Sequence, residues 1–251
     1  MATLLVLGSK PDPCLPPAGS YDDLACANAS GASAARLGLP KPRYSVMSAI
    51  LTSGRKAPNR LALDALQGLR TEDLYFFPRP RRGRSVWQRA GHRLKAFRTT
   101  PLYFRAKLAA RGYRYDRFLN PGLDHYLDLI RSLCGQDPEV LACMERKVPS
   151  TGVVTLALGL GERAYDRVVM SGFSFEISHA YAENPLIHEW GSTRSKHAET
   201  DIAVLRCLAG RFSGLYTSEP TVSARAGLPL LPTATQPDPA ASLPASAAPD
   251  P

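Results

Sequence analysis

The chain has 251 residues, of which 44% are hydrophobic and 21% are charged, and its formal net charge is +9. This length fits one large domain or two small ones, the apolar fraction excludes a disordered chain, and the sparse, aperiodic glycines exclude a collagen-like fibre. No apolar run approaches the roughly 20 residues of a membrane-spanning helix, and the first residues lack the basic start of a secretory signal, so we expect a cytoplasmic globular protein.

Short apolar runs that end at glycine or proline predict an alternation of strands and helices in the first part of the chain. We expect buried strands over 3–7, 23–27, 44–51 and 73–77. The spacing of apolar residues between them predicts short helices over 32–37 and 58–69.

The alternation continues in the second half, where helices are predicted over 122–134, 153–160 and 196–208 and strands over 166–173 and 215–216. Strands that alternate with helices are typical of an α/β fold with an open, mostly parallel sheet. The last segment, 232–251, is rich in proline and alanine and contains no Lys or Arg, which predicts a disordered tail.

The basic character belongs to one segment. Between Arg79 and Arg117 there are 13 Lys or Arg residues and one acid, with aromatic residues interleaved. Such a segment suits phosphate groups, either of a nucleic acid or of an anionic membrane surface. One hypothesis is therefore a non-catalytic module that binds nucleic acid or membrane through residues 79–117.

Common nucleotide and metal motifs are absent from the sequence. Residues 8–13 do not match G-x-G-x-x-G and no P-loop motif occurs, which argues against a dehydrogenase or a P-loop enzyme. The five cysteines form no C-x-x-C pair, so neither a disulfide framework nor structural zinc is predicted. His179, His188 and His197 do not share one helical face, so we predict no metal site.

Ser150, Thr151 and Gly152 follow a proline and open an apolar helix. Hydroxyls and free N–H groups at the positive end of a helix form a site for phosphate or carboxylate. This stretch, with the strand over 166–171 that runs into Gly172 and Phe173, resembles the second conserved motif of the sialyltransferases of glycosyltransferase families 42 and 29.

Further sequence motifs resemble those of these families and occur in the same order along the chain. The first strand ends at Gly8 and Ser9, which resembles the family's Gly-Asn-x-Pro turn with Ser in place of Asn. Asn28 stands where the family contacts the donor. His179 and Tyr181 stand where the family contacts the donor phosphate and the acceptor, and His197 resembles the catalytic histidine, in H-x-x-x-D rather than H-x-x-x-x-[DE].

The resemblance implies a GT-A-like, Rossmann-like domain over 1–78 and 121–231, with a basic helical lid inserted over 79–120. It implies a glycosyltransferase that uses a CMP-activated donor without a metal or other cofactor. The acceptor would be a glycan or a lipid-linked glycan, the lid would suit an anionic membrane surface on the inner face, and nucleic acid would not be a partner.

The resemblance leaves the donor sugar open between sialic acid and Kdo, because both present CMP and a carboxylate. His197 is the expected general base, since its pKa lies near neutrality, and Tyr181 and His179 would stabilise the departing phosphate. Direct displacement would invert the anomeric centre. Related CMP-Kdo transferases that retain configuration need a carboxylate nucleophile, for which Glu176, Glu199 and Asp201 are the candidates.

Overall fold

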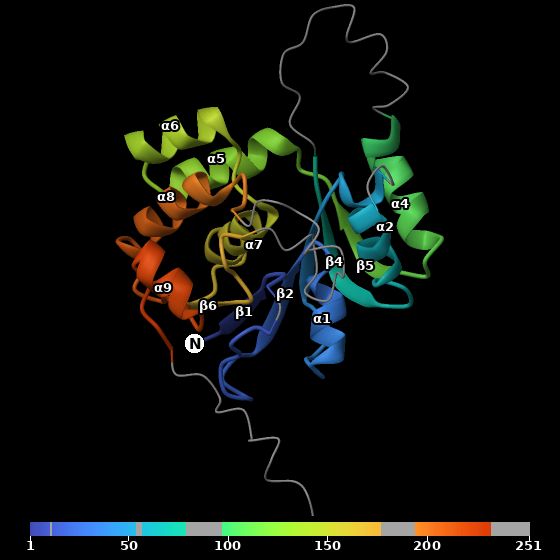
Figure 1. The fold of residues 1–251 in the computed structure, drawn as a ribbon, viewed down its shortest axis with the longest axis horizontal. Coiled ribbons are helices and arrows are strands. Elements are labelled where there is room, and N and C mark those ends of the chain that lie inside the picture. The colour runs from blue at the N-terminus through green and yellow to red at the C-terminus, as the bar shows by residue number, and fades with distance from the viewer. Residues whose placement is uncertain (11, 54–56, 79–96, 177–193, 232–251) are drawn as a thin grey trace, which may run out of the picture.

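The computed structural model describes residues 1–10, 12–53, 57–78, 97–176 and 194–231. Within them, seven parallel strands form one sheet in the order β5-β4-β3-β2-β1-β6-β7 (Figure 1). The strands are β1 Thr3–Leu7, β2 Asp23–Ala27, β3 Tyr44–Ser48, β4 Arg70–Phe77, β5 Arg114–Leu119, β6 Arg167–Ser171 and β7 Leu215–Thr217.

Helices cover both faces of this sheet (Figure 1). On one face lie α1 Ser30–Arg36, α2 Ala57–Asp64 and α4 Pro101–Ala109, with the short helices η1 Leu51–Ser53 and η2 Phe97–Thr99. On the other lie α5 Leu123–Leu133, α6 Pro138–Arg146, α7 Thr151–Leu160, α8 Ala198–Ala209 and α9 Pro220–Ala226. Among the described helices, none is long and apolar enough to cross a bilayer.

The alternation of side chains along β1 explains the two layers of core. Leu4 and Val6 pack in the cluster that contains α7 and α8, whereas Leu5 and Leu7 pack in a second cluster on the α1 side. All four side chains are fully buried, and each such burial stabilises the fold by about 1.5–3 kcal/mol. A strand buried on both faces reads as a continuous apolar run, which is why β1 is visible in the sequence.

The order of the strands reverses between β1 and β6. β2 to β5 extend the sheet on one side of β1, and β6 and β7 extend it on the other. In open parallel sheets, ligands bind beyond the carboxyl ends of the strands at such a switch point. Gly8, directly after β1, and Gly172, directly after β6, lie at this position.

The structure confirms the α/β class, the parallel sheet and the order of the predicted strands and helices. The predicted strand over 44–51 ends at Ser48, the predicted helix over 58–69 ends at Asp64, and the structure adds α4, α6, α9 and β5. Of the predicted lid over 79–120, the structure describes residues 97–120. This part forms η2, α4 and β5, and β5 pairs with β4 as the edge strand of the sheet. The rest of the predicted lid, 79–96, and the predicted tail, 232–251, lie outside the described residues.

Candidate functional site

The start of α7 is fixed by a side-chain cap and by a neighbouring carboxyl group. Ser150 has an extended backbone, and its Oγ accepts a hydrogen bond from the N–H of Val153 at 3.4 Å. The N–H of Ser150 itself donates to Oδ1 of Asp201 at 2.8 Å. The N–H groups of a helix's first turn have no partner within the helix, so those of Thr151 and Gly152 belong to the positive end of α7.

Two glycine turns meet beyond the ends of β1 and β6. The N–H of Gly8 donates to the carbonyl of Ser171, and the N–H of Lys10 donates to that of Gly172, each at 2.8 Å. Gly172 has a φ of +75°, and a Cβ on Gly8 would lie 2.2 Å from the Gly172 oxygen. Both positions therefore need glycine, one for its backbone conformation and one for the close approach of the two turns.

Phe173 connects these turns to α7. A Cβ on Gly152 would lie 2.4 Å from Cε1 of the Phe173 ring, so the ring packs directly on the first turn of the helix. We call the group made of Gly8, Ser9, residues 150–152, Gly172 and Phe173 the glycine-turn site. It joins three segments that are far apart in the sequence.

Asn28 directly follows the neighbouring strand β2 and has a φ of +54°. Its Oδ1 accepts a hydrogen bond from the N–H of Ser48 at 3.0 Å, so the side chain bridges the ends of β2 and β3. The hydroxyl of Ser30 ties this region to β1, because it donates to the carbonyl of Leu7 at 2.8 Å. Asn28 thus lies at the same edge of the sheet as the glycine-turn site.

His197 precedes α8 and contacts the segment that leads into α7. Its Nδ1 lies 2.8 Å from the carbonyl oxygen of Val148. Because a carbonyl only accepts, Nδ1 carries the proton and donates it, which leaves Nε2 as the acceptor of the neutral ring. Burial lowers the pKa of His197, and the hydrogen bond to Val148 opposes this only in part. The ring is therefore neutral at pH 7 and has the form of a base.

Asp201 lies one turn further along α8 and is buried. Burial raises its pKa to about 7, against the opposing effect of the hydrogen bond from Ser150. Its carboxyl group connects α8 to the start of α7, because its Oδ1 accepts the hydrogen bond from the N–H of Ser150. The other two acids considered there are exposed: Glu176, and Glu199, which forms an ion pair with Arg194 at 3.2 Å.

The structure thus brings the predicted residues of the glycine-turn site together. The start of α8 is connected to them by two hydrogen bonds, one between His197 and the Val148 carbonyl and one between the Ser150 N–H and Asp201. Their roles toward a donor stay predictions. His179 and Tyr181, the other two predicted catalytic residues, lie outside the described residues.

Glu219 is a part of this region that the sequence analysis missed. Its side chain is fully buried, and its Oε1 accepts hydrogen bonds from the N–H groups of Gly172 at 2.8 Å and Cys14 at 2.9 Å. Its Oε2 forms an ion pair with the ammonium group of Lys10. One carboxylate therefore holds both glycine turns, because Lys10 follows the Gly8 turn. A single Glu after the three-residue strand β7 gives no sequence signal of burial.

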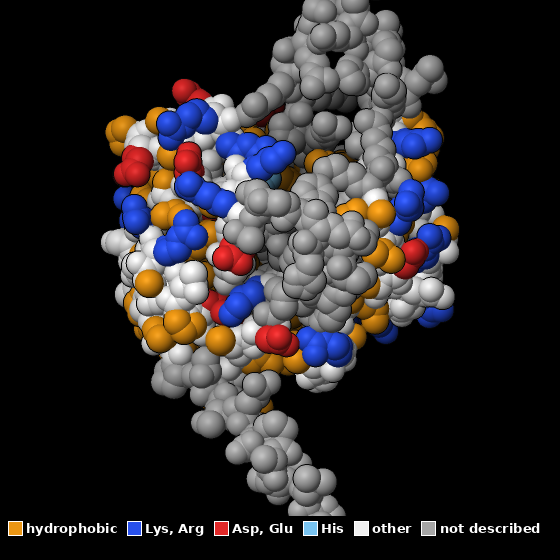
Figure 2. Space-filling model, viewed as in Figure 1, with side chains coloured by type: hydrophobic (Ala, Val, Ile, Leu, Met, Phe, Trp, Pro, Cys, Tyr) orange, Lys and Arg blue, Asp and Glu red, His pale blue; other side chains and the backbone are white. Residues whose placement is uncertain are grey.

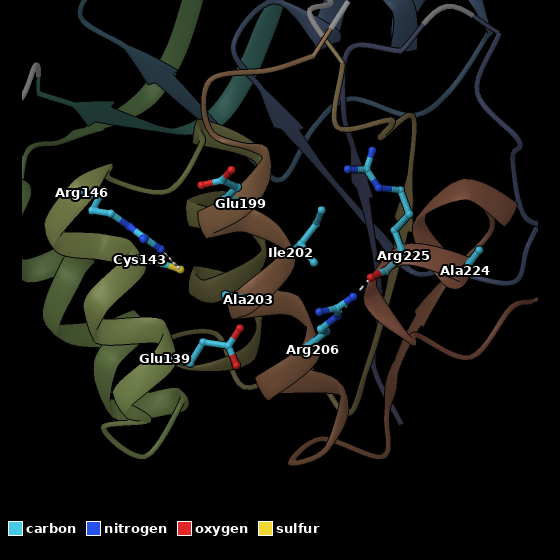
Figure 3. Close-up of a pocket in the computed structure, with 9 residues that line it drawn as sticks. All are labelled: Glu139, Cys143, Arg146, Glu199, Ile202, Ala203, Arg206, Ala224 and Arg225. Carbon is cyan, nitrogen blue, oxygen red and sulfur yellow. Dashed lines mark hydrogen bonds between the residues drawn. The ribbon is translucent and has the colours of Figure 1, made fainter.

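A cavity of about 480 Å³ lies between α6, α8 and α9 (Figure 3). Its lining combines three arginines with two glutamates: Arg146, Arg206, Arg225, Glu139 and Glu199. The guanidinium groups of these arginines point in different directions in Figure 3. No residue of the glycine-turn site lines this cavity. Across the described part of the chain, no group of three or more His, Cys, Asp or Glu residues is placed to hold a metal ion.

Comparison with known proteins yields similar structures but no similar sequences. No protein-family profile and no curated protein sequence matches the chain. Among solved structures, the sialyltransferase CstII from Campylobacter jejuni in complex with a substrate analogue, cytidine-5'-monophosphate, superposes with a TM-score of 0.51 at 16% identity. The match covers 92% of this chain and 86% of that chain.

A variant of CST-II in complex with CMP gives a TM-score of 0.51 at 16% identity, over 93% of this chain and 87% of that one. A variant described as an alpha-2,3/8-sialyltransferase CstII gives 0.50 at 15% identity, over 92% and 87%. At these identities the likeness concerns the fold. The chain has the α/β fold of these sialyltransferases over nearly its whole described length.

Proposed function

We propose that the protein is a glycosyltransferase that moves an acidic sugar, sialic acid or Kdo, from a CMP-activated donor to a glycan or glycolipid acceptor. One observation carries the proposal. In a fold shared with sialyltransferases solved with CMP, the positive end of α7, the glycine turns after β1 and β6, and a neutral histidine lie together at the switch point of the sheet.

In the proposed complex, the donor phosphate lies at the first turn of α7. The N–H groups of Thr151 and Gly152 and the hydroxyl of Ser150 would stabilise the negative charge that grows on the departing CMP. Glycines at 8 and 172 let the donor approach the backbone closely. Asn28, at the end of β2, is the proposed contact for the cytidine side of the donor.

The acceptor hydroxyl needs a base while the sugar passes through an oxocarbenium-like state. Nε2 of His197 is the proposed base, because Nδ1 is occupied by the Val148 carbonyl. Tyr181 and His179 are the proposed donors to the leaving phosphate. We propose inversion at the anomeric centre: Asp201 is buried and bound to the Ser150 N–H, which leaves it unsuited to attack.

The proposed reaction needs no metal or other cofactor. A phosphate is already a good leaving group, and the helix end supplies the electrostatic stabilisation that a metal would otherwise give. Turnover is therefore expected to continue when a chelator such as EDTA is present.

The test is a ligand screen followed by turnover. CMP is expected to raise the melting temperature, whereas UMP and CDP leave it unchanged. The purified protein should then release CMP from CMP-sialic acid or CMP-Kdo, and the donor that turns over identifies the sugar. The anomeric configuration of the product, read by NMR, tests inversion. A protein that responds to no cytidine nucleotide and turns over neither donor would contradict the proposal.

A further inference from the structure

Exposed apolar side chains gather at one corner of the described molecule. The described residues include five exposed large hydrophobic side chains, and three of these lie on neighbouring elements. They are Ile50, which precedes η1, Phe97 in η2, and Leu102 in the first turn of α4. They are 41%, 54% and 69% exposed. η1 packs against both η2 and α4, so the three side chains border one surface.

The outer side of α4 is itself largely apolar. Its exposed residues are Leu102, Arg105, Ala106 and Ala109, which follow the spacing of one helical face. Phe104 and Leu108, on the other side, are fully buried in the core. A surface helix of a soluble domain normally presents mainly charged and polar residues to water, whereas three of these four exposed residues are a leucine and two alanines, beside Arg105. We call this side, together with Ile50, Phe97 and Arg98, the α4 face.

Unpaired cations surround these apolar residues. Residues 97–115 contain five Lys or Arg and no acid. Arg98, Arg105 and Lys107 form no ion pair with a carboxylate in the described part of the molecule. Figure 2 shows blue and orange side chains interleaved along the edge over α4.

Aromatic rings with a polar end complete the surface. The ammonium of Lys107 lies 5.4 Å from the ring of Tyr103, which also contacts Phe97 at 5.4 Å between ring centres. Arg105 stacks over Phe118 and donates to the hydroxyl of Tyr115 at 3.0 Å. Tyrosine rings and long cationic side chains over an apolar base are the composition of proteins that lie in a membrane interface.

We propose that the α4 face docks the protein on an anionic lipid bilayer. Leu102, Phe97 and Ile50 enter the interface, and Arg98, Arg105 and Lys107 bind the lipid phosphates. Ile50 follows the carboxyl end of β3, and Phe97 and Leu102 stand before or at the start of α4. In a parallel sheet, these positions share the edge that carries the glycine-turn site. Docking therefore brings that site to the membrane surface, where lipid-linked acceptors reside.

The test measures vesicle binding by the full chain without any donor, so it is independent of the proposed reaction. We expect binding to vesicles of equal parts phosphatidylcholine and phosphatidylglycerol, and little binding to phosphatidylcholine alone. Arg98→Gln with Arg105→Gln should weaken binding about 25-fold, since each cation near a charged surface is worth about fivefold. Phe97→Ser with Leu102→Ser should weaken it about tenfold or more.

Matched controls lie elsewhere on the molecule: Leu230→Ser changes a leucine that is 50% exposed, and Arg131→Gln removes a half-exposed cation on α5 that pairs with Asp128. Both should bind as the parent does, and circular dichroism checks that every variant is folded. The proposal is overturned if the parent does not bind, if neutral vesicles bind equally, or if the α4 variants match their controls. Duplex RNA that binds tightly with a steep salt dependence, without binding to vesicles, would also overturn it.

Discussion

The glycine-turn site and the α4 face differ in what builds them. The first is made of backbone groups and buried side chains, which are fixed by hydrogen bonds between segments as far apart as Ser150 and Asp201. The second is made of exposed side chains on α4, which is anchored by Phe104 and Leu108, and on the adjoining Ile50 and η2. Substitutions should therefore damage the first through geometry and the second only through its surface chemistry.

The largest expected effect is the loss of turnover when His197 is replaced. His197→Ala removes the proposed base and should lower the rate of CMP release with acceptor by about 10²–10⁴-fold, measured at saturating donor. His125→Ala is the matched control, because this exposed histidine on α5 pairs with Glu162. Equal rates for the two variants would show that His197 is not the base.

The second effect is a pH dependence of stability that comes from Asp201. Its pKa is raised from 3.8 to about 7 in the folded protein, so the folded state holds the proton more tightly than the unfolded state does. The free energy of unfolding therefore falls as pH rises from about 4 to about 7.

Asp201→Asn keeps an acceptor for Ser150 and does not titrate. Relative to the parent, its free energy of unfolding should rise by on the order of 4 kcal/mol between pH 4 and pH 8, measured by urea unfolding. The lowered pKa of His197 acts in both proteins and cancels in the difference. A difference that stays constant with pH would mean that Asp201 titrates like an exposed carboxyl group.

A third effect tests the carboxylate that holds the two glycine turns. Glu219→Gln removes the buried charge opposite Lys10 and should cost about 3 kcal/mol of unfolding free energy at pH 7. Glu72→Gln removes a more exposed carboxylate that pairs with Lys41 and Arg43, and it should cost less than about 1 kcal/mol. Equal losses of unfolding free energy in the two variants would show that the Glu219 carboxylate does not hold the two glycine turns together.

The smallest effect is expected on the α4 face. Leu102→Ala should change the free energy of unfolding by less than about 0.5 kcal/mol, because its side chain is 69% exposed. Leu156→Ala, in the fully buried part of α7, should cost about 2–5 kcal/mol. Denaturant unfolding of the two leucine variants compares both regions directly. A large loss at Leu102 would indicate that the side chain is packed in the folded protein.

Sequence reasoning found β1, β6 and α7 because they contain continuous apolar runs and are followed by glycine. It missed β5 for the opposite reason: Arg114, Asp116 and Arg117 interrupt its apolar residues, and only the pairing with β4 makes this segment a strand. The range predicted for the lid therefore included an edge strand of the sheet.

The candidate site divides in the same way. Gly8, Ser150 and His197 were predictable because each stands in a recognisable local pattern. The contact of Phe173 with Gly152 and the burial of Glu219 depend on how three strand ends meet in space. Contacts between distant residues leave no local pattern: Phe173 is 21 positions from Gly152, and Glu219 is 47 positions from Gly172 and 205 from Cys14.

Hydrogen–deuterium exchange with and without CMP tests the central claim most directly, because it reports which backbone N–H groups the nucleotide covers. We expect slower exchange in peptides that span residues 150–153, with smaller protection over 8–10 and 172–173, and no change over α4. Protection confined to other parts of the chain, or none at saturating CMP, would contradict it.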